Sequence, residues 1–328
     1  VAIALPSFSV IEVAGEEAES FLQNLLTNDI RTLTANTAQL SGFCNPKGRL
    51  LSLFYVIKRE QDFLLVLAAD LAESIAQRLN MFKLRSKVDI TVSPELKVMG
   101  YLSQAPLTNQ ATDFWSGVSL NRELTIYLPG HLHRYLVISA GETTIKEESQ
   151  VGAENLWASA DIEAGLPMVY LQSKEQFTPQ QLNLDIVGGV SFKKGCYPGQ
   201  EVVARLHYLG KPSRRLFLAQ LKTVDIPEPN LEVADESGEV AGHVVRAAML
   251  DSGTLICQLS LKLTAKDKKL FINNKTEEVT ISGTTNSVVF GTNINKSNFF
   301  YGKLGNIVIK KDFGDSCILR VRINDLMK

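Results

Sequence analysis

Apolar residues recur at helical spacing in two segments of the first 90 residues. The first segment follows Gly15 and consists of Ala18, Phe21, Leu22, Leu25 and Leu26. Its i, i+3, i+4, i+7, i+8 spacing predicts an amphipathic helix that ends near Asn28 and Asp29. The second segment consists of Leu71, Ile75, Leu79 and Phe82, with polar residues between them. Each helix is expected to pack its apolar stripe on a core.

Apolar and aromatic runs separated by polar turns predict strands. Residues 50–57 and 63–67 flank a polar segment at 58–62, which predicts a hairpin with a five-residue loop. Three further strand-like runs follow at 97–102, 124–128 and 135–139. Helices and strands therefore alternate over the first 150 residues, as in an α+β domain.

The pattern changes after Pro212 to short β-rich runs separated by turns. The runs cover residues 216–221, 231–234, 242–247, 254–259 and 269–272. Strands at this spacing predict a small β-barrel. We therefore expect a body over residues 1–210 and a barrel over 211–283. Residues 284–328, rich in asparagine and glycine, predict a β-rich extension of unknown role.

The composition limits the classes of function without selecting one. The chain has 328 residues, of which 45% are hydrophobic and 21% charged, and its net charge is -1. These values are typical of a globular protein with two or three domains, and any attraction to nucleic acid must come from a local patch. No apolar run approaches the roughly 20 residues of a membrane span, and the first residues do not resemble a signal peptide. We therefore expect a cytoplasmic monomer without membrane contact.

The cysteines give no metal-binding pattern. Cys44, Cys196, Cys257 and Cys317 stand far apart, without a Cys-x-x-Cys pair. This spacing argues against a structural zinc site and a disulfide scaffold. Four thiolates for an iron-sulfur cluster would be available only if the fold gathered all four cysteines or if cysteines from elsewhere contributed. We predict no metal site.

Residues 193–201, Lys-Lys-Gly-Cys-Tyr-Pro-Gly-Gln-Glu, have the composition of a reactive loop. Lys193 and Lys194 precede Cys196, and adjacent ammonium groups favour the thiolate, which attacks electrophiles or binds metals. Pro198 and Gly199 fit positions i+1 and i+2 of a type II turn. A free cysteine is most often a small buried hydrophobic residue, but the lysines and the turn favour an exposed Cys196.

The same loop resembles the signature of the YgfZ family, which are folate-binding, tRNA-modification proteins related to the aminomethyltransferase of the glycine cleavage system. The defined positions are Lys194, Gly195, Cys196, Tyr197, Gly199, Gln200 and Glu201. Further motifs lie in the expected order at 43–49, 161–167 and 177–184. The resemblance covers about residues 1–283. It implies an aminomethyltransferase-like body of two interleaved α/β halves, followed by a compact barrel.

The resemblance also implies a tetrahydrofolate site. Trp157 corresponds to a tryptophan that lies against the bound folate, and an aromatic face suits a flat pterin. Glu163 corresponds to the carboxylate that holds the pterin, because a carboxylate offers two acceptors to its N–H donors. Phe8 aligns with a second family tryptophan. Without the resemblance, we would expect Trp157 and Phe8 in the core and Glu163 on a helix surface.

The chain departs from the aminomethyltransferases at two positions. It has Ser52-Leu53 where they carry an acidic pair, and Gln200 where they carry an arginine. Serine cannot replace a carboxylate beside the reacting nitrogen, so we do not expect glycine-cleavage activity, and whether the protein turns over a substrate stays open. The resemblance implies an accessory protein that supports iron-sulfur enzyme assembly or repair and thereby tRNA thio-modification. Cys196 and Lys194 would carry its chemistry, with iron-sulfur client proteins, such as tRNA-thiolating enzymes, as partners.

Two alternative functions stay open. A folate-dependent aminomethyl or methyl transferase would turn over a one-carbon donor, and Ser52 counts against it. A tRNA-binding module would use a basic cluster that stands against the single acid Glu201. This cluster consists of Lys193, Lys194, Arg205, Lys211, Arg214 and Arg215. It suits RNA phosphates or the glutamate tail of a folate, or it is a solvated face. No RNA-recognition signature with interleaved aromatic residues is visible, which counts against autonomous RNA binding.

Overall fold

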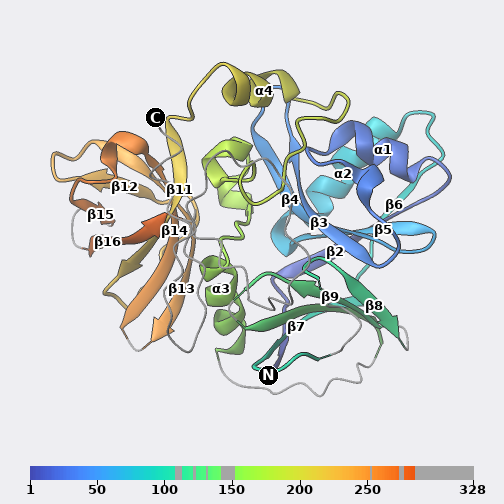
Figure 1. Ribbon diagram of the computed structural model, residues 1–328, viewed down its shortest axis with the longest axis horizontal. Coiled ribbons are helices and arrows are strands. Elements are labelled where there is room, and N and C mark those ends of the chain that lie inside the picture. The colour runs from blue at the N-terminus through green and yellow to red at the C-terminus, as the bar shows by residue number, and fades with distance from the viewer. Residues whose placement is uncertain are drawn as a thin grey trace, which may run out of the picture.

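The fold has three lobes arranged around a central helix, as the computed structural model shows (Figure 1). The structure describes residues 1–107, 113–120, 123–130, 132–141, 152–251, 253–272 and 277–284. Two lobes are five-stranded antiparallel sheets and the third is a closed barrel. The predicted extension lies outside the described residues except for residue 284. No helix in the described ranges is long and apolar enough to cross a membrane.

The first sheet has the strand order β3-β4-β5-β2-β6 and carries the two predicted helices. Its strands are β2 (Phe8–Ala14), β3 (Thr37–Cys44), β4 (Leu50–Lys58), β5 (Asp62–Ala68) and β6 (Asp89–Val92). The helices α1 (Ala18–Leu25) and α2 (Ala72–Lys83) confirm the helical spacing. The predicted hairpin is β4–β5, but its turn is shorter than expected, because the side chain of Arg59 binds Asp62 and both strands continue into polar residues.

The second sheet has the order β1-β7-β10-β9-β8. Its strands are β1 (Ala2–Ala4), β7 (Leu96–Ser103), β8 (Gly117–Leu120), β9 (Glu123–Leu128) and β10 (His133–Ala140). β1 pairs with β7 of this sheet, whereas β2, the next strand in the chain, belongs to the first sheet. The start of the chain therefore interleaves the two halves of the body.

The barrel closes in the order β11-β14-β13-β12-β15-β16. Its strands are β11 (Arg214–Leu221), β12 (Glu232–Asp235), β13 (Val240–Asp251), β14 (Thr254–Lys262), β15 (Leu270–Ile272) and β16 (Glu277–Thr284). The five predicted runs all form strands. β16 was not predicted, and it closes the barrel by pairing with β11. Short 3-10 helices cover Ile30–Thr32, Ala69–Leu71, Leu171–Ser173, Pro179–Leu182 and Leu263–Ala265.

The helix α3 (Ala153–Glu163) lies between the second sheet and the barrel (Figure 1). Its Asp161 is completely buried and accepts hydrogen bonds from two arginines. Arg134 of β10 donates to Oδ1, and Arg246 of β13 donates to Oδ2 at 2.8 Å. This Arg134–Asp161–Arg246 triad joins the body to the barrel, and it holds one more positive than negative charge in the interior.

The outer helix α4 (Gln200–Tyr208) connects the reactive loop to the barrel and lies at the top edge of the molecule in Figure 1. Neither α3 nor α4 was predicted from hydrophobic spacing. α3 buries polar as well as apolar residues, including Ser159 and Asp161. In α4 only Val203 is buried, so neither helix has the apolar stripe on which such a prediction depends.

Candidate functional site

Cys196 lies on an ordered, exposed loop. The loop contains the predicted turn: the amide of Gln200 donates to the carbonyl of Tyr197 at 3.1 Å, and Gly199 has φ +80°. These are the properties of a type II turn, in which glycine accepts the positive φ. Cys196 is exposed, while the next residue, Tyr197, is buried. The prediction of an exposed cysteine held by a Pro-Gly turn is confirmed.

The reactive loop packs directly on the turn between β3 and β4. A Cβ at Gly199 would lie 2.5 Å from the carbonyl oxygen of Asn45 and 2.7 Å from Cα of Gly48, so only glycine fits. The Asn45 side chain shapes this second turn by accepting hydrogen bonds from the amides of Lys47 and Arg49 at 2.9 and 3.0 Å. Two motifs that are about 150 residues apart in the sequence thus form one surface.

Lys194 is buried beneath the loop and holds the end of α1. Its Nζ donates to the carbonyl of Gln23 in the last turn of α1 and to those of Leu26 and Asn28 just after it. Burial lowers the pKa of the Lys194 ammonium to about 8. Lys193, in contrast, is exposed. A role of Lys194 in ionising Cys196 stays a prediction, and Lys193 is the lysine that solvent reaches beside the thiol.

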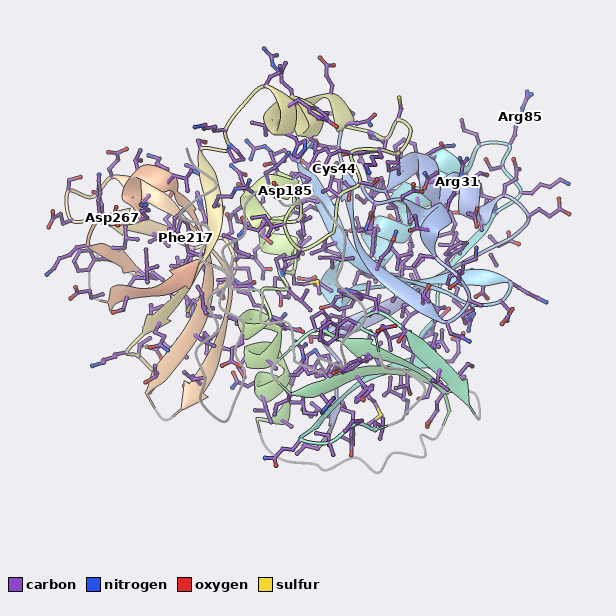
Figure 2. The ribbon with its side chains drawn as sticks, viewed as in Figure 1. Arg31, Cys44, Arg85, Asp185, Phe217 and Asp267 are labelled. Carbon is purple, nitrogen blue, oxygen red and sulfur yellow. The ribbon has the colours of Figure 1, made fainter. Side chains whose placement is uncertain are left out.

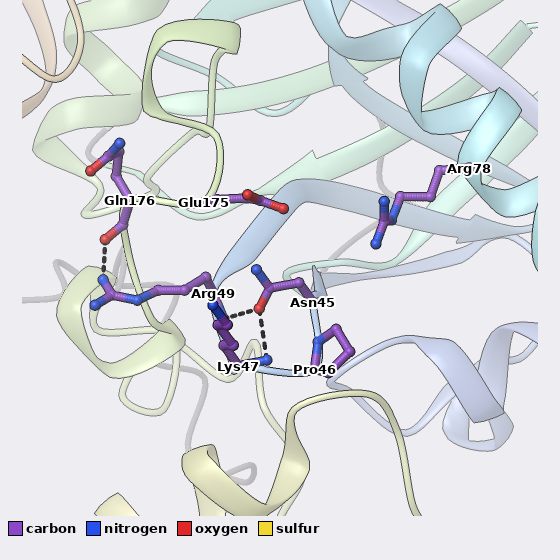
Figure 3. Close-up of a pocket in the computed structure, with 7 residues that line it drawn as sticks. All are labelled: Asn45, Pro46, Lys47, Arg49, Arg78, Glu175 and Gln176. Carbon is purple, nitrogen blue, oxygen red and sulfur yellow. Dashed lines mark hydrogen bonds between the residues drawn. The ribbon is translucent and has the colours of Figure 1, made fainter.

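A pocket of about 590 Å³ lies beside the β3–β4 turn (Figure 3). Its lining residues are Asn45, Pro46, Lys47, Arg49, Arg78, Glu175 and Gln176. Arg49 is turned away from the centre and donates to the carbonyl of Gln176, whereas the Arg78 side chain points toward Asn45 (Figure 3). The Arg78 Nε is buried and has no hydrogen-bond partner in the described part of the chain. Sequence analysis did not single out Arg78, because a lone arginine on a helix carries no signal.

Trp157 is completely buried in α3. The guanidinium carbon of Arg134 lies 4.7 Å from its ring centroid, and a Cβ at Gly100 would lie 2.3 Å from its Cε3. The ring face is therefore covered by protein, while Nε1 has no hydrogen-bond partner among the described residues. Contact with a folate stays a prediction, because the ring and its Nε1 are both buried.

Phe8 is also buried, with its ring stacked on Tyr55 at a centroid distance of 6.2 Å. The hydroxyl of Tyr55 is buried without a hydrogen-bond partner in the described ranges. Burial raises the pKa of Tyr55, so the hydroxyl stays protonated and can donate. The structure thus places Phe8 in the core against the Tyr55 ring, and its contact with a ligand stays a prediction.

Glu163 is the last residue of α3 and is half-buried. Its carboxylate forms no hydrogen bond or ion pair with a described residue, unlike that of Asp161, two positions earlier. A half-buried carboxylate without a partner is able to accept hydrogen bonds from a ligand. This is the property that the resemblance assigned to Glu163.

Ser52 lies on β4 and is completely buried, and its Oγ has no hydrogen-bond partner in the described part of the chain. Ser52 therefore offers a neutral hydroxyl and no carboxylate at the position where the resemblance predicts the loss of the acidic pair. Two members of the basic cluster bind groups within the protein. Lys194 binds backbone carbonyls, and Arg215 pairs with Asp185 at 2.6 Å. Lys193, Arg205 and Lys211 remain exposed.

The other described cysteines are buried: Cys44 on β3 and Cys257 on β14. Burial raises the pKa of the Cys44 thiol to about 12, which keeps it neutral and unreactive. Cys317 lies outside the described residues. Cys196 is therefore the exposed thiol of the described chain.

The fold is that of an aminomethyltransferase. Glycine cleavage system aminomethyltransferase T from Bartonella henselae superposes with a TM-score of 0.65 at 15% identity, covering 88% of this chain and 86% of that one. The predicted α+β body with a C-terminal barrel is thereby confirmed.

The sequence comparison identifies the family. A tRNA-modifying protein YgfZ of Colwellia psychrerythraea is 30% identical over 276 residues, which cover 79% of this chain and 84% of the relative. This chain belongs to the YgfZ family. No family model matches it.

Proposed function

We propose that this protein binds tetrahydrofolate and uses Cys196 to support iron-sulfur enzymes, among them enzymes that thiolate tRNA. The observation that carries the proposal is the exposed Cys196 on a rigid turn, packed against the Asn45–Arg49 turn, within an aminomethyltransferase-like fold. The relative's name, tRNA-modifying protein, supports the link to tRNA.

The folate site is proposed at the C-terminal end of α3, and the chemistry of its side chains fits such a ligand. The unpartnered carboxylate of Glu163 would accept hydrogen bonds from the pterin's N–H groups. Two buried donors without partners in the described chain, Trp157 Nε1 and the Tyr55 hydroxyl, would serve its acceptors. When bound, a tetrahydrofolate that carries a one-carbon substituent would supply that one-carbon unit, whereas unsubstituted tetrahydrofolate would accept one. Cys196 would act as the nucleophile or sulfur ligand toward the client, and Lys193 and Lys194 would supply positive charge near it.

Calorimetric titration with tetrahydrofolate tests the proposal through two variants. Glu163→Gln keeps the size of the side chain but removes its charge, and we expect it to weaken binding about tenfold to a hundredfold. Cys196→Ala should bind folate like the wild type but fail to restore iron-sulfur enzyme activity in cells that lack the protein. No folate binding by the wild type, or full restoration by Cys196→Ala, would contradict the proposal.

A folate-dependent transferase is the less favoured alternative, because Ser52 is buried and uncharged. The alternative of tRNA binding is favoured by a separate observation on α4.

A further inference from the structure

Three aromatic rings meet on the outer surface beside the reactive loop. The Phe192 and His207 rings are stacked at a centroid distance of 3.6 Å with an interplanar angle of 12°. Tyr208 stands edge-on to both, at 6.1 Å from Phe192 and 4.8 Å from His207. His207 is exposed and Tyr208 is 65% exposed. Together these residues form an aromatic platform that a ligand can reach.

Exposed cations surround the aromatic platform. Lys193 follows Phe192 in the chain, Arg205 precedes Tyr208 by one helical turn on the same face of α4, and Lys211 follows the helix. None of their side chains forms a hydrogen bond or ion pair with a residue that the structure describes. Within α4 the only acid is Glu201. The platform is therefore apolar and aromatic at its centre and positively charged at its edge.

We propose that the aromatic platform binds single-stranded RNA, with bases stacked on Tyr208 and His207 and phosphates bound by Lys193, Arg205 and Lys211. Unpaired bases stack on aromatic side chains while lysine and arginine contact the phosphates. An acidic protein partner would contact only the cations, and a purely apolar one would contact only the aromatic rings. The choice of RNA also rests on the proposed function, which links this family to tRNA. The site would hold the RNA beside Cys196.

Fluorescence anisotropy with a labelled 12-nucleotide single-stranded RNA, the same sequence as a duplex, and an unmodified tRNA transcript tests this inference. The wild type should bind the single strand more tightly than the duplex, because the paired bases of a duplex cannot stack on the aromatic side chains. Tyr208→Ala should weaken single-strand binding roughly fivefold to a hundredfold and remove the preference, without changing the salt dependence. Arg205→Ala should reduce the slope of log K against log salt by about 0.7, the value for one phosphate contact.

Arg85→Ala is the matched control, because Arg85 is an exposed arginine that projects from the far end of the body (Figure 2). It should change neither affinity nor slope. The inference is wrong if the wild type does not bind single-stranded RNA, or if Tyr208→Ala and Arg85→Ala behave alike. In either case folate binding by the same samples would still report separately on the proposed function.

Discussion

At the scale of single residues, Lys194 shows how one side chain can belong to a motif and yet serve the fold. Its ammonium binds three backbone carbonyls at the end of α1, where the helix dipole is negative. Replacement by methionine would leave buried carbonyls unpaired. We expect Lys194→Met to lower the free energy of unfolding by about 2 kcal/mol at pH 7. Urea unfolding measures this value, and Lys193→Met, the exposed neighbour, is the control that should have no effect.

The pH dependence of this variant follows from the lowered pKa of Lys194. Burial moves the pKa from 10.5 in the unfolded chain to about 8 in the folded protein. Between these pH values the unfolded state binds more protons than the folded state. The free energy of unfolding therefore rises as the pH rises from 8 toward 10.5. Below pH 8 both states are protonated, and this group gives no pH dependence. The stability difference between wild type and Lys194→Met should therefore widen over this window. A constant difference would show that Lys194 keeps its ordinary pKa.

At the scale of elements, the contact between two turns positions the reactive cysteine. Gly199 has φ +80° and no room for a Cβ against Asn45 and Gly48. We expect Gly199→Ala to destabilise the protein by about 1–3 kcal/mol and to make the 193–201 loop more sensitive to limited proteolysis. Gly195→Ala, in the same loop, meets nothing within 4 Å and should leave both properties unchanged. Equal behaviour of the two variants would mean that the turns do not hold each other.

At the scale of the whole molecule, the Arg134–Asp161–Arg246 triad couples barrel and body. Asp161→Asn leaves two buried guanidiniums without a counter-charge, and we expect a loss of about 3–5 kcal/mol in the free energy of unfolding. Arg246→Met should cost less, because Asp161 and Arg134 then form a neutral pair. The exposed Lys83–Asp89 pair provides the control, since Asp89→Asn should change the stability by less than about 1 kcal/mol. If Asp161→Asn proved no worse than Asp89→Asn in urea unfolding, the triad would not be a structural link.

Local patterns in the sequence determined much of this protein. Apolar residues at a spacing of about 3.6 predicted α1 and α2, apolar runs predicted most strands, and Pro198-Gly199 predicted the turn beside Cys196. These features could be predicted because each one depends on residues that are neighbours along the chain. Tertiary structure alone decided what depends on distant residues. It closed the barrel with β16, buried Lys194 under α1, brought Asp161 to two arginines, and stacked Phe192 on His207. The Phe192 ring at the start of the loop and the His207 ring on α4 therefore meet only in the folded protein, since burial, charge pairing and ring contacts are set by packing.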